Sequence, residues 1–322
     1  MKEKLLVVVF AGLFIILFHS GCAQEGFVRK QAVCPTIAGA SHVGDQSCLD
    51  CHEEVVEGFQ KTIHGRIADF EVVGLSKGCE SCHGHGSIHA EDGDPASIIS
   101  FKDISKGEAS AVCLKCHTSG SLMDWQGSEH SLSDVGCINC HQVHSRTKRL
   151  LAQPEPKLCN DCHQDIRVKT LYPSHHPIKE GKMVCSECHQ AHGGFLKNLK
   201  TEERLNDLCL DCHASKQGPF AFEHEPVVES CVTCHEPHGT VANNLLVQNE
   251  PFLCLQCHQF HFHAGKFGDT GTVTDIYGRS ITSGPQSWRM AYTTKCTQCH
   301  SQIHGSDLPS QGVSGQGKAL TR

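Results

Sequence analysis

One pentapeptide, Cys-x-x-Cys-His, occurs ten times in this chain of 322 residues and uses 20 of its 22 cysteines. Two thiols at this spacing beside an imidazole form the attachment signature of a c-type haem. The thiols add across the two vinyl groups of the porphyrin, and the adjacent histidine lies under the iron as its proximal ligand. The motif cysteines are Cys48, Cys51, Cys79, Cys82, Cys113, Cys116, Cys137, Cys140, Cys159, Cys162, Cys185, Cys188, Cys209, Cys212, Cys231, Cys234, Cys254, Cys257, Cys296 and Cys299. The predicted proximal ligands are His52, His83, His117, His141, His163, His189, His213, His235, His258 and His300.

Other chemistries use paired cysteines but do not account for the adjacent histidine. A Cys-x-x-Cys pair can be half of a zinc site or a thiol redox motif, and neither requires histidine at the next position. Histidine makes up 25 of the 322 residues. Disulfides between cysteines three positions apart would close rings too small to staple distant segments. The sequence therefore predicts ten covalently bound c-type haems.

The motifs form two interleaved series with a common period. The first series begins at Cys48, Cys113, Cys159, Cys209 and Cys254, and the second at Cys79, Cys137, Cys185, Cys231 and Cys296. In the middle of the chain each series advances by 45 to 50 residues per step. This period predicts five two-haem repeats, at residues 48–100, 101–150, 151–200, 201–248 and 249–305. A segment at 22–47 precedes them, and a polar, flexible tail at 306–322 follows.

A six-coordinate iron needs a second axial ligand on the opposite face of the porphyrin. A lone histidine follows four first-series motifs by 11 to 13 residues, and another follows every second-series motif closely. In the fifth repeat His261 and His263 come only 3 and 5 residues after His258. The repeat pattern leaves His42, His85, His175 and His261 unassigned. It selects ten distal ligands: His64, His89, His130, His144, His176, His192, His224, His238, His263 and His304.

The spacing of these histidines limits which iron each can reach. His144, three residues after His141, cannot wrap around a porphyrin to the far side of the same iron. We therefore expect it to bind a neighbouring haem. A histidine 11 to 13 residues downstream has enough chain to reach either its own haem or a neighbour's. An iron held by two histidines has no open position for a substrate, so the sequence predicts an electron carrier without catalytic residues rather than an enzyme. A multihaem reductase would need an exposed five-coordinate haem.

The N-terminus predicts export. A basic start at Met1–Lys4 precedes an apolar run of 14 residues from Leu5 to Phe18, which is typical of a signal peptide at 1–21. The run is shorter than the ~20 residues that span a bilayer as a helix. Ser-Gly-Cys22 resembles the end of a lipobox, which predicts a lipid anchor at Cys22; cleavage after Ala23 is the other interpretation. Cys34 is predicted to be a free thiol.

The composition points to a core that is not made of side chains. Apolar residues make up 39% of the chain and aromatic residues 6%, which is little for a core in a chain of this length. Ten porphyrins are large, flat apolar surfaces, so we expect a multihaem cytochrome c fold: short α-helices and loops wrapped around a haem stack, with little β structure. The formal charge of -7, together with the haem propionates, argues against nucleic acid as a partner.

Several strings outside the haem motifs carry a family resemblance. They include Trp125-Gln-Gly-Ser-Glu-His130, Ser174-His-His-Pro177, Phe222-Glu-His-Glu-Pro226 and the ending Cys296-Thr-Gln-Cys-His-Ser-Gln-Ile-His-Gly305. With them, residues 47–322 resemble the decahaem cytochromes of the MtrA, PioA and DmsE type. The resemblance implies one elongated chain of haems with distal ligands at the ten positions given above.

The same resemblance implies a location and partners. Members are periplasmic, and the conduit type associates with the outer membrane by threading into a β-barrel porin. It passes electrons to or from an extracellular multihaem cytochrome or reductase, with a periplasmic or inner-membrane cytochrome at the other end. A soluble periplasmic shuttle between redox proteins is the alternative function.

Overall fold

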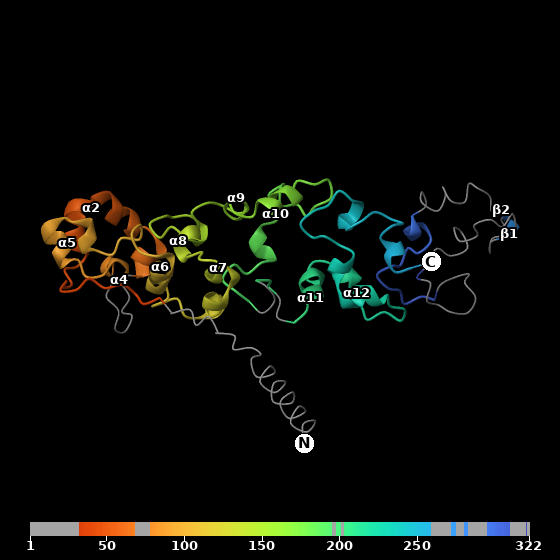
Figure 1. The fold of residues 1–322 in the computed structure, drawn as a ribbon, viewed down its shortest axis with the longest axis horizontal. Coiled ribbons are helices and arrows are strands. Elements are labelled where there is room, and N and C mark those ends of the chain that lie inside the picture. Colours follow the sequence, from red (N-terminus) through yellow and green to blue (C-terminus); the bar gives the residue numbers. More distant parts are fainter. Residues whose placement is uncertain are drawn as a thin grey trace, which may run out of the picture.

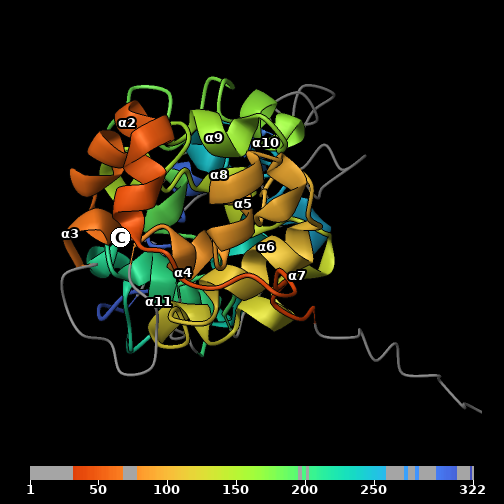
Figure 2. The same ribbon diagram turned by 90° about the vertical axis from the view of Figure 1, so that its left-hand side faces the viewer.

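The described part of the chain forms a rod. The computed structural model describes residues 32–67, 78–194, 198–200, 203–258, 272–274, 280–282, 295–309 and 320. The elements run broadly in chain order along the long axis, from α2 (Asp45–Gln60) and α5 (Ser87–Asp92), which lie together at one end, to the last helical turns toward the other (Figure 1). In the view along the rod, the helices are distributed around this axis (Figure 2).

Regular structure consists almost entirely of short helices. The remaining α-helices are α3 (Ile63–Ile67), α4 (Glu80–His83), α6 (Lys106–Cys113), α7 (Glu129–Leu132), α8 (Cys137–Cys140), α9 (Lys157–Asn160), α10 (Gln164–Lys169), α11 (Leu205–Leu210) and α12 (Glu225–Glu229). The 3-10 turns are η1 (Pro95–Ser97), η2 (Gly120–Leu122), η3 (Trp125–Gly127), η4 (Lys148–Leu150), η5 (Cys185–Glu187), η6 (Ala214–Lys216), η7 (Cys231–Thr233), η8 (Asn243–Leu245), η9 (Cys254–Gln256) and η10 (Cys296–Gln298). Strand β1 (Thr272–Thr274) pairs antiparallel with β2 (Ser280–Thr282), with Val273 opposite Ile281.

The haem motifs themselves explain why the helices are short. In nine motifs the histidine N–H donates to the carbonyl of the first cysteine at 2.9–3.1 Å, which closes a single helical turn. Residues three and four positions apart share one face of such a turn, so the two thiols and the imidazole face the same way. In the tenth motif, inside α2, His52 leaves the helical conformation at φ -118° and ψ 40°. A motif therefore needs one turn and interrupts a longer helix.

Few apolar side chains are buried in the described part of the chain. The buried apolar residues are Val56, Ile99, Ala109, Val112, Trp125, Ala242, Pro251 and Leu320. Instead, one continuous cavity of about 4350 Å³ runs through the rod, lined by residues between Phe59 and Leu320. Haem motifs from Cys113 onward contribute their cysteines and histidines to its wall. Together with the short helices and the small amount of β structure, this confirms the predicted multihaem cytochrome c fold.

Parts of the predicted flexible tail contact the body of the rod. Phe222 and Ser306 exchange two backbone hydrogen bonds of 2.9 Å, and the Gln302 N–H donates to the Leu320 carbonyl at 3.0 Å. The predicted signal peptide, Cys22, His261 and His263 lie outside the described residues. Where the structure describes the chain, it contains no helix with both the length and the apolar character needed to cross a membrane.

Candidate haem centres

Nine of the ten motif histidines face one other histidine. Their ring centres lie 5.9–6.2 Å apart. The pairs are His52–His89, His83–His144, His117–His64, His141–His192, His163–His130, His189–His238, His213–His176, His235–His304 and His258–His224. Every facing histidine is one of the ten distal positions selected from the sequence. The tenth predicted distal position, His263, lies outside the described residues.

This spacing fits an iron atom between the two rings. A metal–imidazole bond of about 2 Å on each side, plus about 1 Å from each nitrogen to its ring centre, gives ring centres about 6 Å apart. Burial lowers the pKa of His64, His144, His192 and His224, and the facing imidazole of each pair lowers it further. These imidazoles are therefore held in the neutral form, which is the form that coordinates a metal.

Backbone carbonyls orient several of the paired imidazoles. The Nδ1–H of His83, His141 and His235 donates to the carbonyls of Ile99, Arg149 and Asn244 at 2.9–3.0 Å. This bond selects the tautomer whose Nε2 is free to face the partner ring. Arg149 and Asn244 have φ of 58° and 56°. In the second and fourth repeats, the accepting carbonyl therefore belongs to a residue whose backbone has the left-handed conformation.

The pairs connect neighbouring repeats in both directions. His144 of the second repeat faces His83 of the first, although it lies only three residues from His141. In the opposite direction, His64 of the first repeat faces His117 of the second. The pattern continues along the rod: eight of the nine pairs join adjacent repeats, and only His52–His89 lies within one. Each repeat is therefore incomplete without its neighbours.

The unassigned histidines that the structure describes have other partners. His42 and His85 face each other with ring centres 6.1 Å apart, and His42 Nε2 lies 2.9 Å from the buried Glu80 carboxylate. His175 Nε2 lies 3.1 Å from Glu180 Oε1. None of the three rings is paired with a motif histidine.

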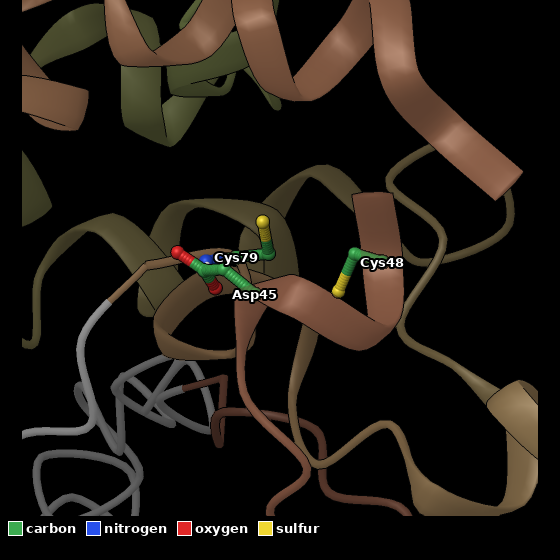
Figure 3. Close-up of side chains that lie close together, drawn as sticks. All are labelled: Asp45, Cys48 and Cys79. Atoms are coloured by element: carbon green, nitrogen blue, oxygen red, sulfur yellow. The ribbon is translucent and has the colours of Figure 1, made fainter. Parts of the chain in front are cut away.

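The first cysteines of the two motifs in a repeat also lie close together. In three repeats the two cysteines form a group with a carboxylate. The two Sγ atoms and a carboxylate oxygen of each group lie within 4.8 Å of one another. Figure 3 shows one such group, with Asp45 and Cys48 at the start of α2 beside Cys79, which precedes α4. The other two are Glu155, Cys159 and Cys185, and Glu250, Cys254 and Cys296. Burial, with Asp45 and Cys48 nearby, raises the pKa of the Cys79 thiol to about 12.

These carboxylates belong to a wider pattern that does not require a metal ion. In every repeat, a polar side chain three or four residues before the first-series cysteine accepts a backbone N–H at the start of the second-series motif, at 2.8–3.2 Å. The acceptors are Asp45, Ser110, Glu155, Asn206 and Glu250. A serine and an asparagine serve as well as three carboxylates, so the shared role is to dock the two motifs. Sequence reasoning missed these residues, although an acceptor recurs at nearly the same offset in all five repeats.

One carboxylate contacts a paired histidine directly. Glu236 Oε1 lies 3.2 Å from His238 Nδ1, and Lys169 Nζ donates to Glu236 Oε2 at 2.9 Å. Burial raises the pKa of Glu236, but the bonds from Lys169 and His238 outweigh burial, and the pKa lies below its usual value. The carboxylate is therefore ionised beside His238.

Comparisons with known proteins find the same attachment motif and a multihaem family. A family model of a doubled CXXCH motif matches residues 175–218 and 224–261, and a model of NrfB-like c-type cytochromes matches residues 79–156. The multihaem cytochrome MtrA of Shewanella baltica is 37% identical over 287 residues, which cover 87% of this chain and 81% of that protein. The c-type cytochrome NrfB of Escherichia coli is 31% identical over 134 residues, covering 38% of this chain and 67% of NrfB.

A solved undecahaem cytochrome from the S-layer of Carboxydothermus ferrireducens matches with 20% identity and a TM-score of 0.13, covering 78% of this chain and 35% of that one. At this score the match carries no argument about the arrangement of the haems. The identity to MtrA extends over most of both chains, and the doubled CXXCH model matches two stretches of this one. The chain therefore belongs to the MtrA family of multihaem c-type cytochromes, electron carriers that hold several haems covalently through Cys-x-x-Cys-His motifs.

Proposed function

We propose that this protein holds ten c-type haems in one continuous file and conducts electrons along it. Each iron is bound by its motif histidine and by the histidine that faces it in the structure. His263 serves the motif of His300. When bound, each haem iron takes up and releases single electrons. The two facing histidines would hold each iron, and with both bound there would be no coordination position left for a substrate.

One observation carries this proposal: the paired histidines connect each repeat to the next along the rod. His144 and His83, and likewise His192 and His141, come from adjacent repeats. An iron between such rings would be bound by two repeats at once. Because the motif-bearing elements run broadly in chain order along the axis, haems bound in this way would also follow one another along the rod (Figure 1).

In the cell, we place this rod in the periplasm at the outer membrane. Electrons would cross the periplasm and pass through an outer-membrane porin to or from an extracellular multihaem cytochrome or reductase. A periplasmic or inner-membrane cytochrome would be the partner at the other end. A hydrocarbon core of about 30 Å separates the two sides of a membrane. Irregular backbone like that of this rod is tolerated at that depth only where other protein shields it from lipid. The resemblance to MtrA and the predicted signal peptide both support this location.

The experiment is to isolate the protein from outer membranes in mild detergent and to identify what accompanies it. Cys22→Ala is the matched control, because it removes the predicted lipid anchor and leaves a direct protein contact intact. We expect a porin in stoichiometric amount with both forms. A monodisperse cytochrome in the periplasmic fraction without a porin would overturn the conduit and support the soluble shuttle between redox proteins.

A further inference from the structure

Glu236 sits between two predicted iron sites. It directly follows His235, the motif histidine of one site, and its carboxylate contacts His238, which faces His189 of another. Both carboxylate oxygens have partners: Oε1 lies 3.2 Å from His238 Nδ1, and Oε2 accepts from Lys169 at 2.9 Å.

The backbone holds Glu236 firmly in this position. The Glu236 N–H donates to the Leu245 carbonyl at 2.8 Å, and Thr240 exchanges two backbone hydrogen bonds with Ser174. Gly239, at φ 145°, lies so close to the Lys169 carbonyl that a Cβ there would overlap its oxygen. The side chains of Glu236 and His238 are each 28% exposed, so the bond between them is largely screened from water.

The partner of His238 differs from those of other paired imidazoles. In six others with described Nδ1 bonds, namely His83, His89, His130, His141, His176 and His235, the acceptor is a neutral backbone carbonyl. The residue two positions before the distal histidine is Gln142, Gln190 and Gln302 in the second, third and fifth repeats. A carboxylate occupies this position only in the fourth repeat, at Glu236.

We infer that Glu236 is a positioning and tuning residue that gives the iron between His189 and His238 a lower reduction potential than a glutamine would. The inference rests on the ligand assignment under Proposed function. A carboxylate that accepts the Nδ1–H of a ligating imidazole makes that imidazole a stronger donor. A stronger donor and a nearby negative charge both favour the ferric form, and hydrogen bonding to the ligand is one of the means by which proteins set haem potentials.

The test exchanges the residues between two repeats of the intact holoprotein. Glu236→Gln installs the residue that three other repeats carry, and Gln190→Glu installs the carboxylate beside His192, which faces His141. In an optical redox titration, Glu236→Gln should move about one tenth of the haem absorbance to higher potential. The expected shift is about tenfold in the equilibrium constant for reduction, or 59 mV for one electron. Gln190→Glu should shift a similar fraction to lower potential, and both variants should remain fully low-spin.

A second pair of variants identifies the iron concerned. His238→Met replaces the hydrogen-bonding ring by a thioether, which raises the potential and separates that iron from the rest. In this background Glu236→Gln should change the equilibrium constant of the separated iron less than in the native background, because the ring N–H is gone. An equal effect in both backgrounds, or an unchanged titration for Glu236→Gln alone, would overturn the tuning role.

His238→Ala distinguishes failure of this inference from failure of the ligand assignment. One high-spin iron in ten supports the assignment on which the inference rests. If every iron stays low-spin, His238 is not a ligand, and the assignment and the tuning role fall together. A high-spin iron combined with an unshifted Glu236→Gln titration retains the ligand and removes only the role of Glu236.

Discussion

Replacing His192 by alanine tests the pairing of repeats most directly. The His192 ring faces that of His141 at an interplanar angle of 23°, with ring centres 5.9 Å apart, and Trp125 lies edge-on to it at 6.1 Å. The other motif histidines that the structure describes, apart from His300, already face partners of their own. No replacement imidazole is therefore expected at this site. One iron of the ten should become high-spin, so the ferric high-spin signal in electron paramagnetic resonance should account for about one tenth of the iron.

The same variant can show which iron has lost its ligand. Replacing Cys137 and Cys140 by alanine prevents haem attachment beside His141, and in combination with His192→Ala it should abolish the high-spin signal. Replacing Cys185 and Cys188 by alanine removes the haem of the His189 motif, and His189 lies only three residues before His192. In combination with His192→Ala, this control should leave the high-spin signal in place.

The reasoning fails if the two combinations behave the other way round. A signal that survives loss of the His141 motif and disappears with the His189 motif would mean that His192 serves its own repeat. A fully low-spin His192→Ala protein would mean that the facing rings do not bind one iron.

Three further predictions concern stability and ligand identity. Asn206→Ala removes hydrogen bonds with the Cys231 N–H and two carbonyls, all of 2.8–3.1 Å. It should lower the free energy of unfolding by roughly 2–4 kcal/mol in denaturant titrations of the holoprotein, and an unchanged midpoint would contradict the docking role. Asn244→Val places a β-branched residue at φ 56° and should cost roughly 1–2 kcal/mol by the same titration, whereas Asn244→Gly should cost much less; equal losses would argue against backbone strain. His176→Ala should make about one tenth of the iron high-spin and His175→Ala none, and the reverse would exchange their roles.

Much of the candidate site is visible in the sequence because haem attachment is a local property. Two thiols and an imidazole must share one helical turn, so five consecutive residues identify each attachment point. The distal positions recur in register with these motifs, and the nine that the structure describes each face a motif histidine. Asp45, Ser110, Glu155, Asn206 and Glu250 recur in register as well, but short polar and acidic side chains near a helical turn can bond many backbone groups, so their docking role emerged only from the structure.

The partner of each histidine cannot be read from its position in the chain. His144 is three residues from His141, yet it faces His83, which lies 61 residues earlier. The second ligand must approach the opposite face of a flat group, which the short segment after a motif cannot reach. The cost of closing a loop rises only slowly with loop length, so distance along the chain does not favour one distant histidine over another. The packing of adjacent repeats brings the two rings face to face. Glu236 contacts His238 locally, two residues away, but only the packing of adjacent repeats brings Lys169 against the other oxygen of the same carboxylate.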